Sequence, residues 1–248
     1  MVLTALALAF LSVATSYGDP QPAGTSEAGH ENTITIRIHN YANTNPSIVR
    51  HARETASDVL RHAGVNSVWL ECPVGAHDSP NASCEQPFSP LTFQVNLIPR
   101  PMSTRLHVLP GVLGLAAETG DNGFASTAFI FYDDAKSCAE KRREDFDELL
   151  GSIIAHELGH LLLGTNSHSS MGLMSNFWSS KQLLTVQQRG LHFSIDEAER
   201  ARQAILARKL ASTATQASAR TAPVSATNAA TQQLQTDLGG RSYYVPID

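Results

Sequence analysis

The chain has 248 residues, of which 42% are hydrophobic and 17% are charged, and its formal net charge at pH 7 is −5. That length and apolar content can bury a sizeable core, and they indicate one large domain with additional segments. The small negative charge leaves no electrostatic footprint for nucleic acid, and the charges between residues 133 and 148 are mixed in sign, as on a solvated surface. No apolar run is long enough to span a bilayer.

The N-terminus has the composition of an export signal. Residues 2–14 form an apolar run of secretory length, and the small residues Ala14, Ser16 and Gly18 follow it. No Lys or Arg precedes the run, which departs from the usual pattern, and the alternative interpretation is a buried N-terminal strand or helix. The sequence therefore predicts a secretion signal over residues 1–18 and a secreted or extracytoplasmic protein.

The middle of the chain is expected to form an α/β layer. Residues 33–39, "TITIRIH", alternate isoleucine with polar residues, which is the period of a half-buried strand. Asn45-Pro46 starts a helix that ends at Gly64, and "SVWLEC" resumes a strand; such a strand–helix–strand unit is normally parallel and right-handed. Residues 91–98 and 124–132 are the further predicted strands, helices follow them, and "GVLG" and "GDNG" are interpreted as turns at most.

The three cysteines agree with export. Cys72 and Cys84 flank a loop rich in Pro, Gly, Asn and Ser, which a disulfide between them would close, leaving Cys138 unpaired. Three reduced thiols, or a cysteine that binds a metal, are the open alternatives. Asn81-Ala82-Ser83 fits a glycosylation sequon, which has meaning only in a eukaryotic secretory pathway.

The segment "DELLGSIIAHELGHLLLG" has the apolar periodicity of a helix and carries two histidines on its other side. His156 and His160 are one helical turn apart, so both imidazoles can reach a single ion. Glu157 is adjacent to the first histidine and is expected to point toward the space beside the metal, where it would take a proton from water. Histidines that merely form hydrogen bonds in a core are the alternative. The pattern favours a catalytic site with Zn²⁺ as cofactor.

From His156 onward the sequence resembles the metzincin clan of zinc peptidases, and within it the matrixins. The clan's pattern is HExxHxxGxxH followed by a methionine turn, and His156, Glu157 and His160 match it outright. The following "HSSMGLMSN" is similar to the matrixin histidine-serine pair and methionine turn. By this likeness Met174 is the turn methionine, with Met171 as second choice.

The third zinc ligand is displaced relative to the clan's pattern. The pattern's glycine and third histidine would fall on Leu163 and Asn166, whereas Gly164 and His168 lie one and two residues later. Glycine can end a helix in a left-handed conformation, and zinc constrains ligand distance and angle rather than loop length. His168 is therefore the predicted third ligand, two residues beyond the usual spacing.

A carboxylate from the helix after Ser194 is the rival third ligand, as in zinc peptidases with a downstream glutamate. Glu197 and Glu199 are the available side chains. Ser194 and Glu197 also fit a capping box, which would by itself explain these residues.

The resemblance implies a fold and a division of the chain. The expected fold is α/β, of the α+β zincin or metzincin-like kind, with a mixed twisted sheet over an active-site helix and a methionine turn. Residues 31–211 are the predicted catalytic domain. Residues 212–248 are rich in Ala, Ser, Thr and Gln with few large apolar groups, and we interpret them as a disordered tail.

The function implied is that of a secreted zinc-dependent endopeptidase. A zinc-activated water would attack the peptide carbonyl with Glu157 as general base. The expected partner is a peptide or protein substrate, which in the family pairs with an edge strand; residues 124–132 or the stretch from Leu106 are the candidates. A metal-dependent amidase of the cell envelope and a catalytically inactive, zinc-stapled binding protein stay open as alternatives. Glu157 speaks against the inactive protein, because a structural site has no use for a base.

Overall fold

The structure is a computed structural model that describes residues 32–75, 78–106, 108, 111–117, 124–164, 167–176, 178–179 and 190–221, with side chains of the last segment up to residue 213. The predicted secretion signal over residues 1–18 lies outside the described residues.

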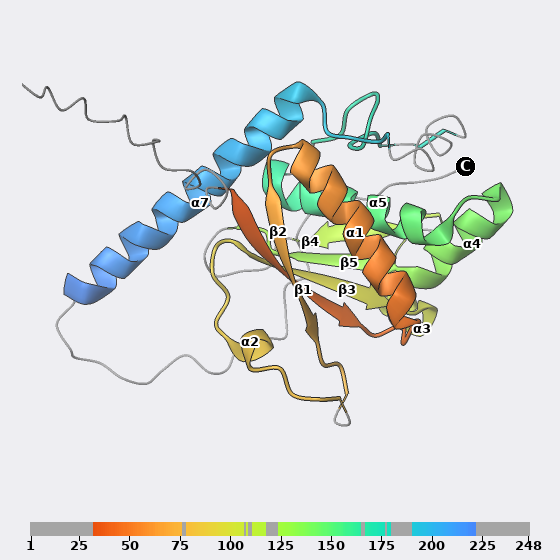
Figure 1. Ribbon diagram of the computed structural model, residues 1–248, viewed down its shortest axis with the longest axis horizontal. Helices are drawn as coiled ribbons and strands as arrows, with labels where there is room; N and C mark the ends of the chain where they lie inside the picture. Colours follow the sequence, from red (N-terminus) through yellow and green to blue (C-terminus); the bar gives the residue numbers. More distant parts are fainter. Residues whose placement is uncertain are drawn as a thin grey trace, which may run out of the picture.

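A five-stranded mixed sheet in the order β2-β1-β3-β5-β4 forms the centre of the fold (Figure 1). The strands are β1 (Thr33–Asn40), β2 (Asn66–Cys72), β3 (Thr92–Ile98), β4 (Gly114–Ala117) and β5 (Thr127–Phe131). The first four in sheet order are parallel, and β4 runs antiparallel to β5 at the edge. The predicted mixed α/β sheet is therefore present.

The unit β1-α1-β2 forms as the sequence predicts. Helix α1 (Pro46–His62) begins where the Asn45 side chain accepts a hydrogen bond from the Ser47 amide at 2.9 Å, and Pro46 occupies the first turn. The helix buries one apolar stripe against the sheet, made of Val49, Ala52, Ala56, Val59 and Leu60. Strands β1 and β2 then pair in parallel.

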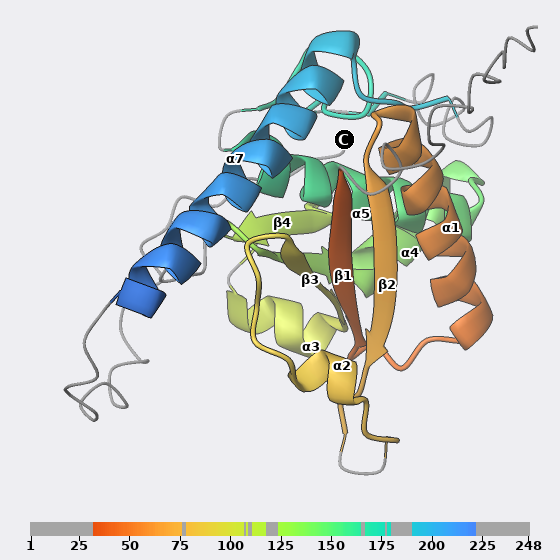
Figure 2. The same cartoon turned by 60° about the vertical axis from the view of Figure 1, so that its left-hand side comes forward.

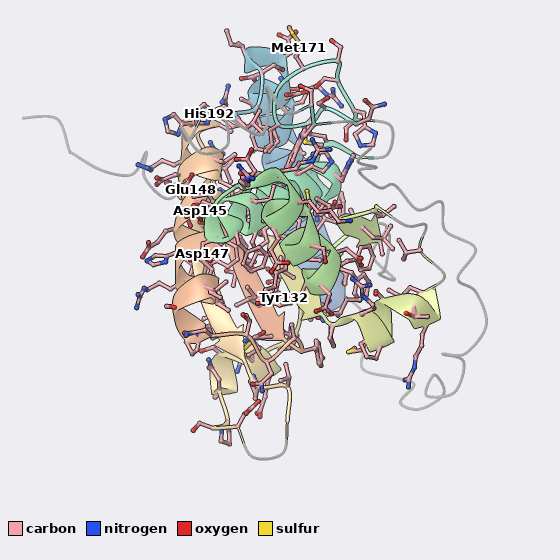
Figure 3. The ribbon with its side chains drawn as sticks, turned by 90° about the vertical axis from the view of Figure 1, so that its right-hand side faces the viewer. Tyr132, Asp145, Asp147, Glu148, Met171 and His192 are labelled. Atoms are coloured by element: carbon pink, nitrogen blue, oxygen red, sulfur yellow. A yellow bond between two sulfur atoms is a disulfide. The ribbon has the colours of Figure 1, made fainter. Side chains whose placement is uncertain are left out.

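Helix α5 (Phe146–Leu163) lies beside α1 on one face of the sheet (Figures 1 and 2). The carboxylate of Asp145 caps its start by accepting from the amides of Asp147 and Glu148 at 3.0 and 3.1 Å; Figure 3 labels these three residues. Gly151 lets the two helices approach closely, since a Cβ there would lie 2.6 Å from the backbone oxygen of Ala52. This packing leaves α5 buried from Leu149 to Leu162.

The remaining helices lie around this core. They are α2 (Ala82–Glu85), α3 (Arg100–Ser103), the short 3₁₀ helix η1 (Thr104–Leu106), α4 (Tyr132–Arg142) and α7 (Ile195–Thr221). Helix α7 packs against α5 near its start and projects away from the sheet at its other end (Figures 1 and 2). Among the helices of the described residues, none is long and apolar enough to cross a membrane.

Two predictions about the strands near the site need correction. The segment "GVLG" is more than a turn, because Gly114 begins β4. This strand is only four residues long and has no β-branched side chain, so no alternation of residue types reveals it. The strand predicted over residues 124–132 is observed as β5 at Thr127–Phe131, and Tyr132 already belongs to α4.

The tail predicted from Ser212 also differs in its first part. Helix α7 continues through Thr221, and residues 222–248 lie outside the described residues. Residues 212–221 include no large apolar residue, which argues against a buried helix. The Ala, Gln and Arg residues among them have high helix propensity and can extend a helix that is already nucleated.

Cys72 and Cys84 form a disulfide with a Cα–Cα distance of 5.7 Å, which confirms the predicted pairing. Cys138 is buried and unbonded to another cysteine. Within the loop, the side chain of Asn81 caps α2 by accepting from the Ser83 amide and donates to the backbone oxygen of Glu71. The sequon asparagine therefore has a structural role.

Candidate metal centre

Helix α5 brings the first two predicted ligands together. His156 and His160 are 0% and 3% exposed, and their rings meet edge-to-face with centroids 4.7 Å apart. The Nε2 atoms of the two rings are 3.0 Å apart. The i, i+4 spacing therefore directs both nitrogens to one point.

His168 reaches the same point from the segment that follows the helix. Helix α5 ends at Gly164, whose φ of 84° and ψ of −178° lie in a region open essentially to glycine alone. The His168 Nε2 lies 3.1 Å from that of His160, and the three histidines can offer ligand atoms within 4.8 Å of one another. Asn166, which stands at the pattern's position for the third histidine, lies outside the described residues.

Hydrogen bonds on the far side of two rings orient them. The Nδ1 of His156 lies 2.7 Å from the backbone oxygen of Leu173, and that of His160 lies 2.9 Å from the Ser167 hydroxyl. A carbonyl oxygen can only accept, so Nδ1 of His156 carries the proton and its Nε2 carries a lone pair. Such outer partners are typical of metal-binding histidines.

Burial keeps these imidazoles neutral. Removal from water lowers the pKa of His156 to about 3, and the neighbouring His168 adds to this while the Leu173 carbonyl opposes it. Burial likewise lowers the pKa of His160 to about 2, helped by the other two histidines, and lowers that of His168. Neutral imidazole is the form that binds a metal ion.

The donor set fits a tetrahedral cation such as zinc. Ligands at 2.0–2.1 Å from one ion in tetrahedral geometry have nitrogens about 3.3 Å apart, close to the 3.0 and 3.1 Å found here. Convergent lone pairs repel one another unless a proton or a cation lies between them. The arrangement is therefore that of a site for a positive ion.

Met174 packs against Gly159 of α5, the residue before His160. It is fully buried, and a Cβ on Gly159 would lie only 2.4 Å from its sulfur. Trp178, also fully buried, meets the His156 ring edge-on at 5.6 Å. Met171, the second choice for the turn methionine, is 76% exposed and lies at the periphery of the molecule (Figure 3), so it does not belong to the core as Met174 does.

Glu157 lies on α5 against strand β4. A Cβ on Gly114 would meet its Oε1 at 2.4 Å and its Cδ at 2.7 Å. The side chain is 0% exposed, and neither carboxylate oxygen has a hydrogen-bond partner of good geometry among the described residues. Burial raises the pKa of this carboxyl well above its usual range, and the backbone amide of Ala116 acts in the opposite direction to a smaller extent. Carboxyl groups with a strongly perturbed pKa are enriched at functional sites, which makes Glu157 a candidate functional residue.

The rival carboxylates are engaged elsewhere. Glu197 and Ser194 form the predicted capping box, with the Ser194 amide donating to the glutamate at 2.7 Å and the Glu197 amide donating to the serine hydroxyl at 3.3 Å. Glu199 accepts from Arg202 and Gln203 on the surface of α7. Neither belongs to the group of side chains that converge at the histidines.

Three residues that shape the site were not foreseen from the sequence. Gly114 gives space to Glu157, while Ser167 and Leu173 orient two imidazoles. The contribution of Leu173 comes from its backbone, so its residue type carries no signal. Gly114 stands between apolar residues, where a glycine is unusual in a strand and indicates a close approach of another group.

Comparisons with known proteins give little beyond this geometry. No family model matches the chain, and no curated protein matches it. Among solved structures, the crystal structure of archaemetzincin from Methanopyrus kandleri is similar over 71% of this chain and 97% of that chain, with 17% sequence identity and a TM-score of 0.39. A likeness of this extent carries no argument about the site, so the function rests on the histidines and Glu157.

Proposed function

We propose that the protein is a zinc-dependent endopeptidase of metzincin-like architecture, with His156, His160 and His168 as ligands and Glu157 as general base. One observation carries the proposal: three neutral imidazoles converge, and the residue that follows the first of them is a fully buried glutamate whose carboxylate oxygens have no hydrogen-bond partner of good geometry among the described residues. A purely structural zinc site has four protein ligands and needs no base. Three histidines with an adjacent carboxylate fit a site with an open position.

Zinc bound by three histidines would supply Lewis acidity, which lowers the pKa of water and polarises a carbonyl group. A cation at the triad also opposes the effect of burial on Glu157 and favours its carboxylate form. Glu157 would then accept the proton of the attacking water and deliver it to the leaving amine. Because the Glu157 side chain is buried away from water, its electrostatic interactions with a bound cation and with the attacking water would be stronger than at the surface.

Strand β4 is the proposed partner of the extended substrate. The amide of Phe131 donates to the oxygen of Leu113, so in this antiparallel pair the backbone groups of Gly114 and Ala116 point away from β5. Among the described strands these groups lie on the outer edge of the sheet, beside Glu157. The strand predicted over residues 124–132 cannot serve, because β5 lies between β3 and β4. The stretch beyond Leu106 supplies the edge instead.

The proposal has two finer parts, the matrixin-like subtype and the export of the protein. The matrixin-like subtype is supported by the pair His168-Ser169 and by the buried Met174. Export is supported by the apolar run at residues 2–14 and by the Cys72–Cys84 disulfide, since disulfides persist in oxidising compartments.

Metal analysis combined with digestion of a peptide library tests the proposal. Purified protein should contain about one zinc ion and cleave internal peptide bonds, a chelator should abolish cleavage, and added zinc should restore it. A zinc-loaded protein that cleaves only cell-wall amides would favour the amidase. One that hydrolyses neither substrate would favour the inactive binding protein.

A further inference from the structure

We propose that Gly114 is a positioning residue for catalysis: its missing side chain leaves the space in which the Glu157 carboxylate lies, between strand β4 and helix α5. This inference rests on the function proposed above. It goes beyond that function because it assigns the orientation of the base to a residue on a different element, outside the zinc-binding motif.

The contact involves the whole end of the glutamate side chain. A Cβ built on Gly114 would lie 2.4 Å from Oε1 and 2.7 Å from both Cγ and Cδ of Glu157. Carbon atoms in contact need about 3.5 Å, so any side chain at position 114 would occupy the volume that the carboxylate now fills. The glutamate is fully buried, and no described residue holds its oxygens in good hydrogen-bond geometry. Steric confinement against Gly114 therefore limits where the carboxylate can lie, and the Ala116 amide acts on it from the same strand.

The backbone of Gly114 does not itself require glycine. Its φ is outside the positive range, unlike that of Gly111 in the preceding loop, whose φ is 86°. It pairs with Ile130 in regular antiparallel register, and alanine is compatible with this conformation. Glu157 alone accounts for the three closest contacts of the missing Cβ. A substitution at this position thus acts on the base more directly than on the strand.

A methyl group at position 114 is expected to displace the Glu157 side chain. The strand is held by its ladder to β5, so the glutamate side chain moves, by about 1 Å if the contact is to reach a normal distance. A misplacement of that size can cost about 100-fold in rate. The histidines are untouched, so zinc affinity stays. Substrate binding along the β4 backbone also stays, so the loss falls on kcat and not on KM.

The test measures the effect of the Gly114→Ala substitution in two backgrounds, the parent protein and the Glu157→Asp variant. Gly114→Ala should lower kcat about 100-fold with KM and zinc content unchanged, and cobalt(II) bound in place of zinc should keep the absorption spectrum of the parent. In the Glu157→Asp background, where the side chain is one methylene shorter, the same Gly114→Ala change should lower kcat only a few-fold. Gly75→Ala is the matched control, because the nearest atom to its added Cβ is 3.8 Å away.

Each outcome decides the inference. Unchanged kcat in Gly114→Ala overturns it, and so does an equal loss in both backgrounds, since Gly114 would then act through the strand. If circular dichroism shows that Gly114→Ala does not fold, the double variant Gly114→Ala/Glu157→Asp decides. The double variant folds only if the added methyl group clashes with the side chain at position 157. A parent without peptidase activity overturns the proposed function as well, whereas an active parent with an equally active Gly114→Ala overturns this inference alone.

Discussion

The chemistry of single residues at the metal centre depends on which imidazole nitrogen carries a proton. The backbone oxygen of Leu173 accepts from Nδ1 of His156 and also from the indole of Trp178 at 3.2 Å, so its position is fixed from two sides. This leaves Nε2 as the metal-facing atom. The ligand geometry is thus set by a backbone carbonyl in the segment that also holds Met174.

Replacing His168 with Ala should remove most of the zinc affinity, because two imidazoles on one helix leave the ion without its third ligand. Isothermal titration with zinc measures the change. Glu199→Ala is the control, since that side chain is engaged on the surface of α7. Loss of zinc binding in Glu199→Ala with retention in His168→Ala would favour the downstream-glutamate class.

The buried Glu157 predicts a pH-dependent stability in the metal-free protein. Its pKa is raised above the unfolded value, so its contribution to stability is full below about pH 4.5 and is lost as pH rises through the folded pKa. The Glu157→Gln substitution removes the titrating carboxyl group and therefore removes this loss of stability at higher pH. The variant should therefore melt at a higher temperature than the parent, by a margin that grows as pH rises from 4.5.

The histidines change stability in the opposite direction. Their pKa values are lowered from 6.5, so the unfolded chain binds protons first and stability falls as pH drops below about 6.5 in parent and variant alike. Thermal unfolding with a chelator between pH 4.5 and 8 separates the two effects. A melting difference that does not change with pH would contradict the account of Glu157.

Helix α7 is connected to other parts of the fold by hydrogen bonds from one of its arginine side chains to backbone oxygens. Arg208 is buried and donates to the backbone oxygens of Leu161, Ala125 and Pro90. Its guanidinium also lies 4.8 Å from the ring centroids of both Phe93 and Phe124. Leu161 lies in the last turn of α5, where carbonyl groups lack helical partners. Burial lowers the pKa of Arg208 to about 10, so it stays charged at neutral pH. This one side chain joins α7 to the helix that bears the histidines.

Arg208→Lys should lower the free energy of unfolding by about 2–4 kcal/mol, because an ammonium group cannot reproduce the planar fork and leaves buried carbonyls unsatisfied. Chemical denaturation measures the change. The exposed Gln203→Ala on the same helix should stay within about 0.5 kcal/mol of the parent. A parent-like Arg208→Lys would show that α7 docks by its apolar contacts alone.

The elements also show what the sequence could predict. The strand–helix–strand unit has strong periodicity and a clear cap at Asn45, and it formed as expected. Helix α5 also formed, capped by Asp145, although it is buried on all sides from Leu149 to Leu162. Strand β4 was missed because four small or apolar residues have no recognisable period, and its partner β5 is needed to define it. The pair His156 and His160 could be predicted from spacing because a helix fixes it, whereas His168 lies two residues beyond the clan's spacing and had a rival in the downstream glutamates. The contact of Glu157 with Gly114 could not, since it joins elements far apart in the sequence.

In the whole molecule, one disulfide closes the loop that follows β2. Unreduced protein from an oxidising compartment should show Cys72 joined to Cys84 and Cys138 as a free thiol by mass spectrometry. Replacing both bonded cysteines with serine should cost about 3 kcal/mol, since the closed loop is short, with a sequence separation of 12. Detection of Cys72 and Cys84 as free thiols would contradict the pairing and weaken the proposal of export.

At the scale of the whole molecule, the proposed active site lies at the antiparallel edge of the sheet. Helices α1 and α5 cover the same face of the sheet, β4 borders α5, and the triad lies where α5 ends. Substrate, base and metal would thus meet at the junction of one strand edge and one helix. Under the proposed function, every element of this junction would be needed for hydrolysis, whereas only the histidines would be needed to bind the ion.

The most direct test of the central claim compares the parent with Glu157→Gln at equal zinc content. Glutamine keeps the shape of the side chain and loses only the proton acceptor, so the variant should bind one zinc ion with parent-like affinity. Its rate of peptide cleavage should fall by about 10²–10⁴-fold. A zinc-loaded Glu157→Gln variant that cleaves peptides as fast as the parent would contradict the account.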